Sequence, residues 1–184
     1  MVCGSDSSSI GFSVIDDPRL EINRVAFAEK KDWLERLDLA ANDLTESVKA
    51  MDYVKGQIEN LNKRLALSAD SSLFKKGKEI IVEIDSLKNQ LVQSKQKTFQ
   101  DVINFPNQLD AKIRHIQSVI ENSYPPVTNG QTMRATDVME EWKMKKESWL
   151  KIQAEDINGF NVEIKRTDIP FISTKIPEKK ETKP

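Results

Sequence analysis

The chain's single histidine and single cysteine are the first residues to consider for chemistry. Catalysis by His115 needs an acid or base within hydrogen-bond reach. Neither Asp110 nor Glu121 lies three or four positions away, the spacing that brings helical side chains together. Cys3 needs a base or a helix terminus to activate its thiol, and its neighbours supply neither. One histidine and one cysteine also exclude an intramolecular disulfide scaffold and metal sites built from several such residues. We therefore expect no catalytic residue, no bound metal and no cofactor.

Acidic side chains gather near the end of the chain, and carboxylate clusters hold metals in some helical bundles. Those sites use Glu-x-x-His motifs on facing helices, and the sequence contains no such motif. Lysines alternate with the carboxylates, which is typical of a solvated, salt-bridged helix face. The acidic residues are Glu140, Glu141, Glu147, Glu155 and Asp156, and the lysines are Lys143, Lys145, Lys146 and Lys151.

The tryptophans suit either a sugar-binding surface or a packed core. Aromatic faces stack on sugars, but Trp142 and Trp149 are one heptad apart, and aromatic residues at helical spacing are typical of a core. A basic stretch over residues 75–97 follows a more acidic one, so complementary charge between neighbouring helices explains it. The chain carries 28 Lys and Arg against 29 Asp and Glu. This balance gives no field that would attract a nucleic acid.

The spacing of apolar residues and prolines predicts four helices that position these side chains. No proline lies between Pro18 and Pro106, and the stretch is rich in helix-favouring residues. A heptad-like seam begins at Leu34 and runs through Leu65. Pro106 suits the first turn of a helix, and Asn104 before it is a candidate cap. The predicted helices cover residues 22–67, 72–99, 106–122 and 132–166.

Long helices with short loops favour an all-α, up-down antiparallel bundle with coiled-coil-like packing and crossing angles of about 20°. A first helix of about 45 residues would be close to 65 Å long, so the bundle should be an elongated rod. Residues 11–17 alternate weakly and suggest the remnant of a last strand from a preceding domain. The predicted core comprises Leu34, Leu44, Ile84, Leu91, Ile113, Trp142 and Trp149.

This pattern divides the chain into three parts. Residues 1–19 form a flexible leader with the strand remnant, residues 20–172 form the bundle, and residues 173–184 form a charged, disordered tail. The first nine residues have neither the basic region nor the apolar region of a signal peptide. No stretch approaches the roughly 18–20 uncharged apolar residues of a membrane helix.

Two short motifs, together with the Asp-Pro-Arg turn around Pro18, resemble the C-terminal helical region of bacterial BNR-repeat, sortilin-like β-propeller proteins, often labelled glycosyl hydrolases. One motif is the N-[FY]-P-x-x-L-x-x-K-[IL] turn, and the other closes the last helix. The resemblance covers residues 14–172, and it lies in the order and spacing of the motifs. The residues that carry it are Pro18, Asn104, Phe105, Pro106, Leu109, Lys112, Ile113, Asp156, Phe160, Asn161, Pro170 and Ile172.

The resemblance implies a non-catalytic accessory module whose parent proteins are periplasmic or extracellular. The propeller, which would carry any catalytic residues, has no counterpart in the sequence, so no active-site residue is carried over. The expected partner is the propeller of a parent chain or another protein, with no nucleic acid and no membrane span. Two alternatives stay open. One is a coiled-coil adaptor that self-associates as a homo-oligomer through the first helix, and the other is a carbohydrate-binding part of a glycosyl hydrolase.

Overall fold

The longest helix, α1 (Arg24–Leu65), begins after Asn23, whose backbone is extended. The Asn23 Oδ1 atom accepts hydrogen bonds from the backbone N–H groups of Val25 and Ala26, both at 3.1 Å. This cap satisfies two of the donors that a helix start leaves unpaired. The 42 residues of α1 make it about 63 Å long. The length of the whole bundle follows from this one helix.

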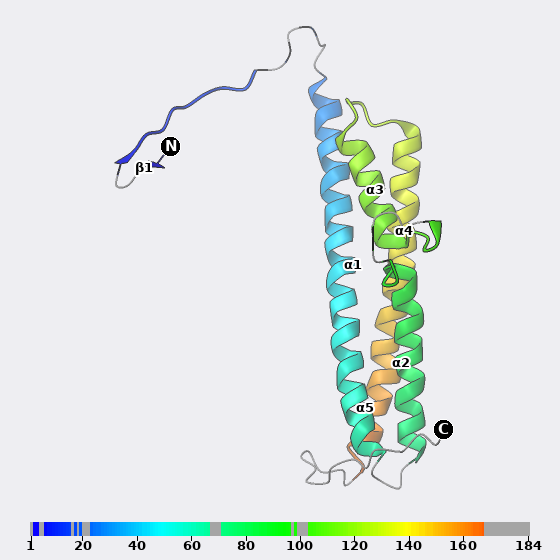
Figure 1. Cartoon of the computed structure of the whole chain (residues 1–184). Coiled ribbons are helices and arrows are strands. Elements are labelled where there is room, and N and C mark those ends of the chain that lie inside the picture. Colours follow the sequence, from blue (N-terminus) through cyan, green and yellow to red (C-terminus); the bar gives the residue numbers. More distant parts are fainter. Residues whose placement is uncertain are drawn as a thin grey trace.

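The computed structural model describes residues 2–3, 6–15, 17, 19, 23–66, 71–96, 98 and 103–167. Pro18, Phe99, Pro170 and Ile172, four residues of the sequence predictions, lie outside these ranges. Two strands of two residues each, β1 (Val2–Cys3) and β2 (Asp6–Ser7), pair antiparallel near the N-terminus. Residues 11–15, which belong to the predicted strand remnant, have no strand partner in the described chain and lie extended away from the helices (Figure 1).

The remaining helices are α2 (Ser71–Leu91), α3 (Leu109–Glu121), α4 (Asn129–Lys151), the π-helix η2 (Ile152–Ile157) and α5 (Asn158–Ile164). In Figure 1, α1 runs down the rod, α2 and α3 return one after the other, and α4, η2 and α5 run down again as one continuous helical stretch. The predicted all-α, elongated helical bundle is confirmed. Because α2 and α3 are stacked end to end, the rod is three helices thick, and α1 runs parallel to α4.

Two predicted helix boundaries are wrong in the same region. α2 ends at Leu91, where the apolar period ends, instead of residue 99. α3 begins at Leu109 because Gln108 is its extended N-cap residue, and this cap has no side-chain hydrogen bond. Pro106 stays in the loop, where its carbonyl accepts from Gln93 Nε2 and Gln108 Nε2, both at 3.2 Å. Asn104 is exposed in a turn and caps no helix.

The start of α4 has a signal that the sequence prediction of residue 132 passed over. Thr128 and Gln131 form a capping box, in which Gln131 N donates to Thr128 Oγ1 and Thr128 N donates to Gln131 Oε1. Each residue satisfies a backbone donor of the other, so α4 begins at Asn129.

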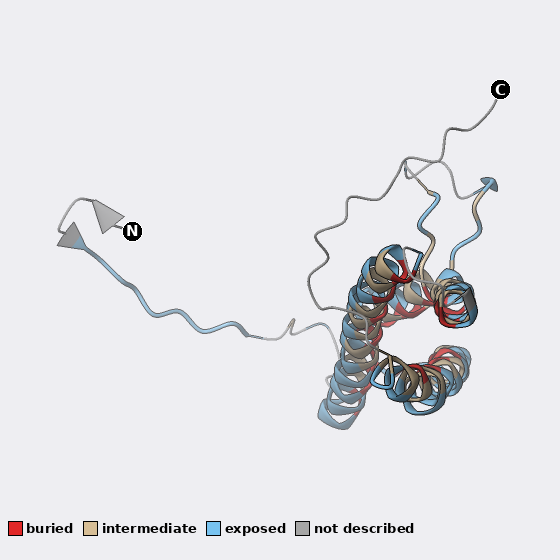
Figure 2. Ribbon diagram, turned by 90° about the horizontal axis from the view of Figure 1, so that it is seen from below, coloured by how far each residue is buried: buried red, intermediate tan, exposed pale blue. Residues whose placement is uncertain are grey.

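One contiguous apolar core runs the length of the rod. Seen along the axis in Figure 2, the helices form an arc with their buried residues on its inner side. In the upper half, the first part of α1 packs against α3 and α4, which also pack against each other. We call this three-helix part the closed half. In the lower half, α2 packs against α1, η2 and α5, but α1 makes no close contact with η2 or α5 in the described chain. We call this part the open half.

Candidate functional site

An apolar groove lies between α1 and α5 in the open half. It has a volume of about 520 Å³ and is lined mainly by aliphatic side chains around Phe160. Polar side chains, among them Arg64 and Asn161, complete its lining. The groove lies where α1 and α5 both pack against α2, while no Cα atom of α1 comes within 8 Å of one in α5. The apolar lining residues are Val54, Ile58, Leu61, Ile157, Phe160 and Ile164.

The structure divides the motif residues between two regions. Leu109 is buried at the start of α3, whereas Asn104 and Pro106 are exposed in the loop before it. Phe160 is buried and lines the groove together with the exposed Asn161. Asp156 is on η2 and lines a second pocket on the side facing α2. α3 and α5 make no close contact in the described chain, so the turn motif and the closing motif are not brought together.

The π-helix η2 stands between the groove and the second pocket and contributes residues to both. A π-helix is wider than an α-helix, and such segments occur frequently at functional sites. Ile157 of η2 lines the groove. The second pocket, on the other side of η2, is lined by Ile152, Glu155 and Asp156. The sequence prediction of an uninterrupted α-helix over residues 132–166 missed this segment.

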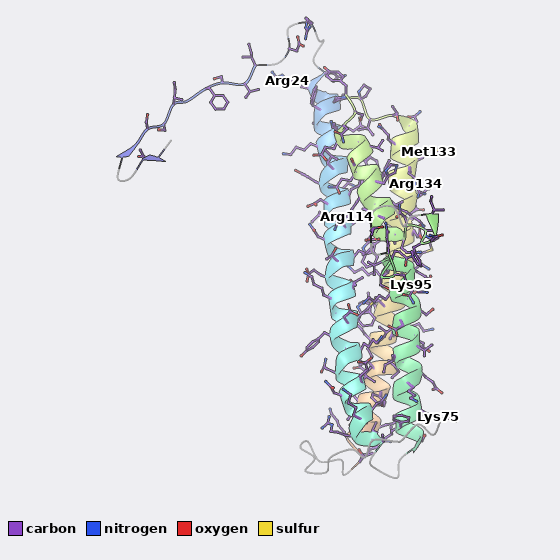
Figure 3. The ribbon with its side chains drawn as sticks, in the orientation of Figure 1. Arg24, Lys75, Lys95, Arg114, Met133 and Arg134 are labelled. Carbon is purple, nitrogen blue, oxygen red and sulfur yellow. The ribbon has the colours of Figure 1, made fainter. Side chains whose placement is uncertain are left out.

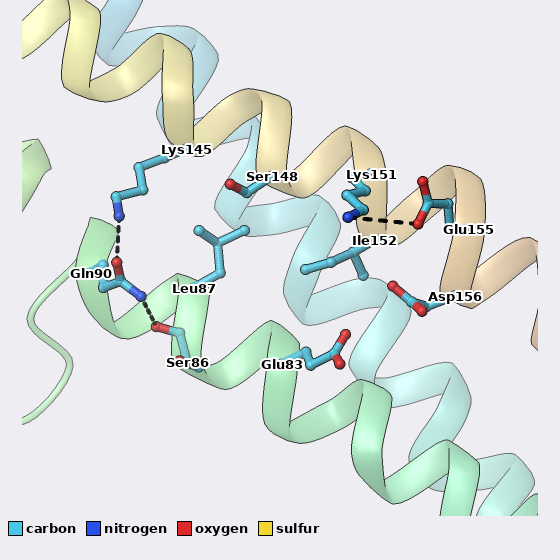
Figure 4. Close-up of a pocket in the computed structure, with 10 residues that line it drawn as sticks. All are labelled: Glu83, Ser86, Leu87, Gln90, Lys145, Ser148, Lys151, Ile152, Glu155 and Asp156. Carbon is cyan, nitrogen blue, oxygen red and sulfur yellow. Dashed lines mark hydrogen bonds and ion pairs between the residues drawn. The ribbon is translucent and has the colours of Figure 1, made fainter.

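The second pocket, between α2 and the α4–η2 junction, is polar and has a volume of about 470 Å³ (Figure 4). Lys145 Nζ donates to Gln90 Oε1, and Gln90 Nε2 donates to the backbone carbonyl of Ser86. Ser148 donates its hydroxyl proton to the Met144 carbonyl at 3.1 Å, so this hydroxyl is engaged with its own helix. The pocket therefore offers a mixed-charge surface without a serine paired to a base.

A buried amide meets a glycine where α1 and α2 cross. Asn62 is 6% exposed, and its Oδ1 atom has no hydrogen-bond partner in the described chain. A Cβ atom on Gly77 would stand 2.4 Å from this oxygen, so residue 77 has room for hydrogen only. Asn62, its partner, was missed because it is a polar residue beside the apolar seam.

Asp43 on α1 joins two residues of α4 in the closed half. Its Oδ2 atom accepts from Trp142 Nε1 at 3.0 Å and from Lys146 Nζ at 2.7 Å. Trp142 and Lys146 are four positions apart and therefore lie on one face of α4. The buried indole thus keeps a partner for its only polar group, as buried tryptophans usually do.

Ion pairs join α1 and α2 across their interface. Lys55 of α1 donates to both Asp85 oxygens of α2 at 2.7 Å, and Lys88 of α2 pairs with Asp52 of α1. The pKa of Lys55 is raised, first by the hydrogen bond to Asp85; burial lowers it, and the charges of Asp85, Glu59 and Asp52 raise it. Complementary charge between the first two helices was predicted, and the structure shows it in both directions.

His115 is exposed on α3, and Cys3 pairs with Asp6 in the two-stranded hairpin. No group of three or more His, Cys, Asp or Glu side chains within the described ranges is arranged to hold a metal ion. The predicted core residues Leu44, Ile84, Leu91, Ile113, Trp142 and Trp149 are buried. Leu34 is only half-buried against the core, and its neighbour Trp33 takes the buried position.

No protein-family model, curated protein or solved structure matches the chain. The resemblance to the sortilin-like β-propeller proteins therefore stays a prediction. Within the described ranges, none of the helices has a stretch long and apolar enough to cross a membrane.

Proposed function

We propose that the chain is a non-catalytic helical module that binds an apolar segment of another protein in the α1–α5 groove. The observation that carries the proposal is the groove itself, an apolar surface formed by Leu61, Ile157 and Ile164 around Phe160. Grooves between helices commonly bind an extended or helical segment whose apolar side chains enter the space between them. Among the described residues that line it, the only ionisable side chain is Arg64, which carries a fixed positive charge. This chemistry supports binding better than proton transfer.

The resemblance to the C-terminal region of BNR-repeat, sortilin-like propeller proteins supports the same class of function. Under this proposal the module accompanies a larger body, a propeller or another protein, and any catalysis belongs to that body. The long rod suits such a role because a rigid spacer fixes the distance between what is attached at its two ends.

The two alternatives receive unequal support. A carbohydrate surface needs exposed aromatic faces, but Trp33, Trp142 and Trp149 are 8%, 5% and 3% exposed. Self-association along the whole seam of α1 needs that seam to be free, and α2, α3 and α4 pack on it everywhere except at the groove residues Val54, Ile58 and Leu61. Self-association through another surface keeps the support of exposed apolar residues elsewhere in the chain.

Binding of the dye 1-anilinonaphthalene-8-sulfonate tests the proposal. With the chain diluted until light scattering gives the monomer mass, we expect saturable fluorescence enhancement below the melting transition. Leu61→Gln should abolish most of it, because Leu61 lines the groove and the polar side chain removes apolar surface there. Leu39→Gln is the matched control, since Leu39 is exposed on the same helix outside the groove. Enhancement that is absent, or equal in the two variants with helicity retained, would contradict the proposal.

A further inference from the structure

The N-terminal arm, residues 10–15, is the most exposed apolar segment of the described chain. Ile10, Phe12, Val14 and Ile15 are 91%, 85%, 88% and 83% exposed. Their backbone is extended and stands away from the rod, as Figure 1 and the side chains of Figure 3 show. Side chains alternate along an extended chain, so Ile10, Phe12 and Val14 share one face. Such an uncovered row of large apolar side chains marks an interaction segment.

The arm and the groove of one chain are too far apart to meet. The groove begins at Val54, thirty residues beyond the start of α1, or about 45 Å along the helix axis. From Arg24 back to Ile15 the chain reaches at most about 32 Å, and back to Phe12 about 43 Å. Only Ile10 could touch the near end of its own groove. The arm therefore cannot fill the groove of its own chain, and an occupied groove needs the arm of another copy.

The groove fits the arm in length. Its wall on α1 runs from Val54 to Arg64, which is about 15 Å of helix. Residues 10–15 in extended conformation span about 17 Å. Three side chains on one face of this segment would point into a volume of about 520 Å³ lined by aliphatic residues and Phe160.

Charge favours the same pairing. Before Arg19 the chain contains Asp6, Asp16 and Asp17 but no lysine or arginine. Asp17 pairs with Arg19 at 2.6 Å, so the negative charge of the arm rests on the other two residues. The end of the rod beside the groove carries Lys63, Arg64, Lys165 and Arg166. An acidic arm that enters a groove with a basic end gains electrostatic attraction, which salt would screen.

We infer that two copies of this chain associate as an antiparallel, two-fold dimer. Each copy inserts Ile10, Phe12 and Val14 of its arm into the α1–α5 groove of the other. The inference rests on the proposed binding function of the groove and names its occupant. A two-fold arrangement makes both contacts at once and closes the assembly. Stable interfaces bury roughly 1,200–2,000 Å², so a reciprocal exchange of two arms is favoured over a single insertion.

Light-scattering mass after size exclusion, measured across a concentration series with reductant, tests the inference. We expect a species of about 42 kDa, twice the 21.0 kDa of one chain. Phe12→Asp in the arm and Leu61→Gln in the groove should each weaken dimerisation at least tenfold, whereas Leu39→Gln, outside the groove, should leave it unchanged. Mixing the Phe12→Asp and Leu61→Gln chains should restore part of the association, because the mixed pair keeps one intact arm and one intact groove. Raised salt should weaken the dimer.

Several outcomes would overturn the inference. The inference is wrong if the chain stays monomeric at high micromolar concentration. It is also wrong if a dimer forms but neither Phe12→Asp nor Leu61→Gln weakens it. If removal of residues 168–184 is what opens the groove of a monomer to dye, the chain's own C-terminal segment is the occupant. Dye binding separates the two proposals. If the chain is a monomer whose dye binding depends on Leu61, the proposed binding function stands and the arm exchange is contradicted. If the monomer binds no dye, both proposals are contradicted.

Discussion

The closed and open halves of the rod share α1 but are built differently. In the closed half, α1, α3 and α4 all pack against one another, and specific polar contacts tie them together. Asp43 holds Trp142 and Lys146, and Lys30 of α1 donates to the carbonyls of Glu121 and Ser123, both at 2.8 Å. Lys30 thereby satisfies carbonyls that the end of α3 would otherwise leave unpaired.

The departures from regular helix packing described above all lie in the open half. They are the contact between Gly77 and Asn62 with its unpaired oxygen, the π-helix η2, the groove and the second pocket. α2 packs against both α1 and α5, whereas α1 and α5 have no Cα atoms within 8 Å of each other in the described chain. From this comparison we expect the closed half to contribute more to stability, while the proposed binding groove lies in the open half.

The largest expected effect compares one substitution in the two halves. Ile113→Ala removes a fully buried side chain from the closed half and should lower the free energy of unfolding by about 2–5 kcal/mol. Ile164→Ala removes a half-buried side chain at the groove and should lower it by at most about 1.5 kcal/mol. Urea unfolding followed by circular dichroism measures both. Equal losses would show that the two halves are equally tightly packed.

A second test concerns the close contact between α1 and α2. Gly77→Ala places a methyl group against the Asn62 amide and should cost about 1–3 kcal/mol of stability. In an Asn62→Ala background the same change should instead stabilise by about 0.5–1 kcal/mol, because alanine favours helix over glycine. A double-mutant cycle by thermal or urea unfolding gives the coupling. Additive effects would place the cost of Gly77→Ala somewhere other than Asn62.

The Asp43 contact allows a finer test within the closed half. Asp43→Ala should lower stability by about 1–2 kcal/mol, because the buried Trp142 N–H loses its acceptor. Asp43→Asn keeps an acceptor for the indole and should lose less. Unfolding followed by tryptophan fluorescence reports both variants. If Asn and Ala lose the same amount, the charge on Lys146 rather than the indole determines the contribution of Asp43.

The smallest expected effect is a pH dependence in the open half. Since the folded-state pKa of Lys55 is raised, its contribution is fully present below the unfolded value of about 10.4 and is lost as pH rises through the higher folded value. Asp85→Asn removes the first cause of that shift and should flatten the decline of stability between pH 10 and 12. The difference should stay below about 1 kcal/mol, because the pair is partly solvated. A decline that is as steep in Asp85→Asn as in the parent chain would exclude this pair as its source.

Periodicity was enough to predict the helices but not how they close around the core. The seam residues Val54, Ile58 and Leu61 were assigned to a continuous apolar stripe, and the structure indeed places them on one face of α1. The same side chains line a groove because α5 stays away from α1, which depends on where a distant helix packs. A one-dimensional pattern records which face is apolar and contains no information about what covers it.

Loop chemistry explains the errors at the helix ends. Pro106 satisfies the usual rule for a first helical position, but two glutamine side chains bind its carbonyl and hold it in the loop. The candidate site was foreseen only through Phe160, Asn161 and Asp156, which came from the closing motif. The π-helix and the contact between Asn62 and Gly77 depend on packing between helices, so sequence spacing alone could not reveal them.

The break between α2 and α3 has a consequence for how the chain can change in length. α1 and the continuous α4–η2–α5 stretch both run past this break (Figure 1). The loop between α2 and α3 can therefore become longer without changing how these two helical stretches are aligned with each other. Doubling the length of a flexible loop costs only about 0.6 kcal/mol of closure entropy. An insertion in this loop, even a small folded domain, would project from the middle of the rod. The distance between the two ends of the rod would stay the same.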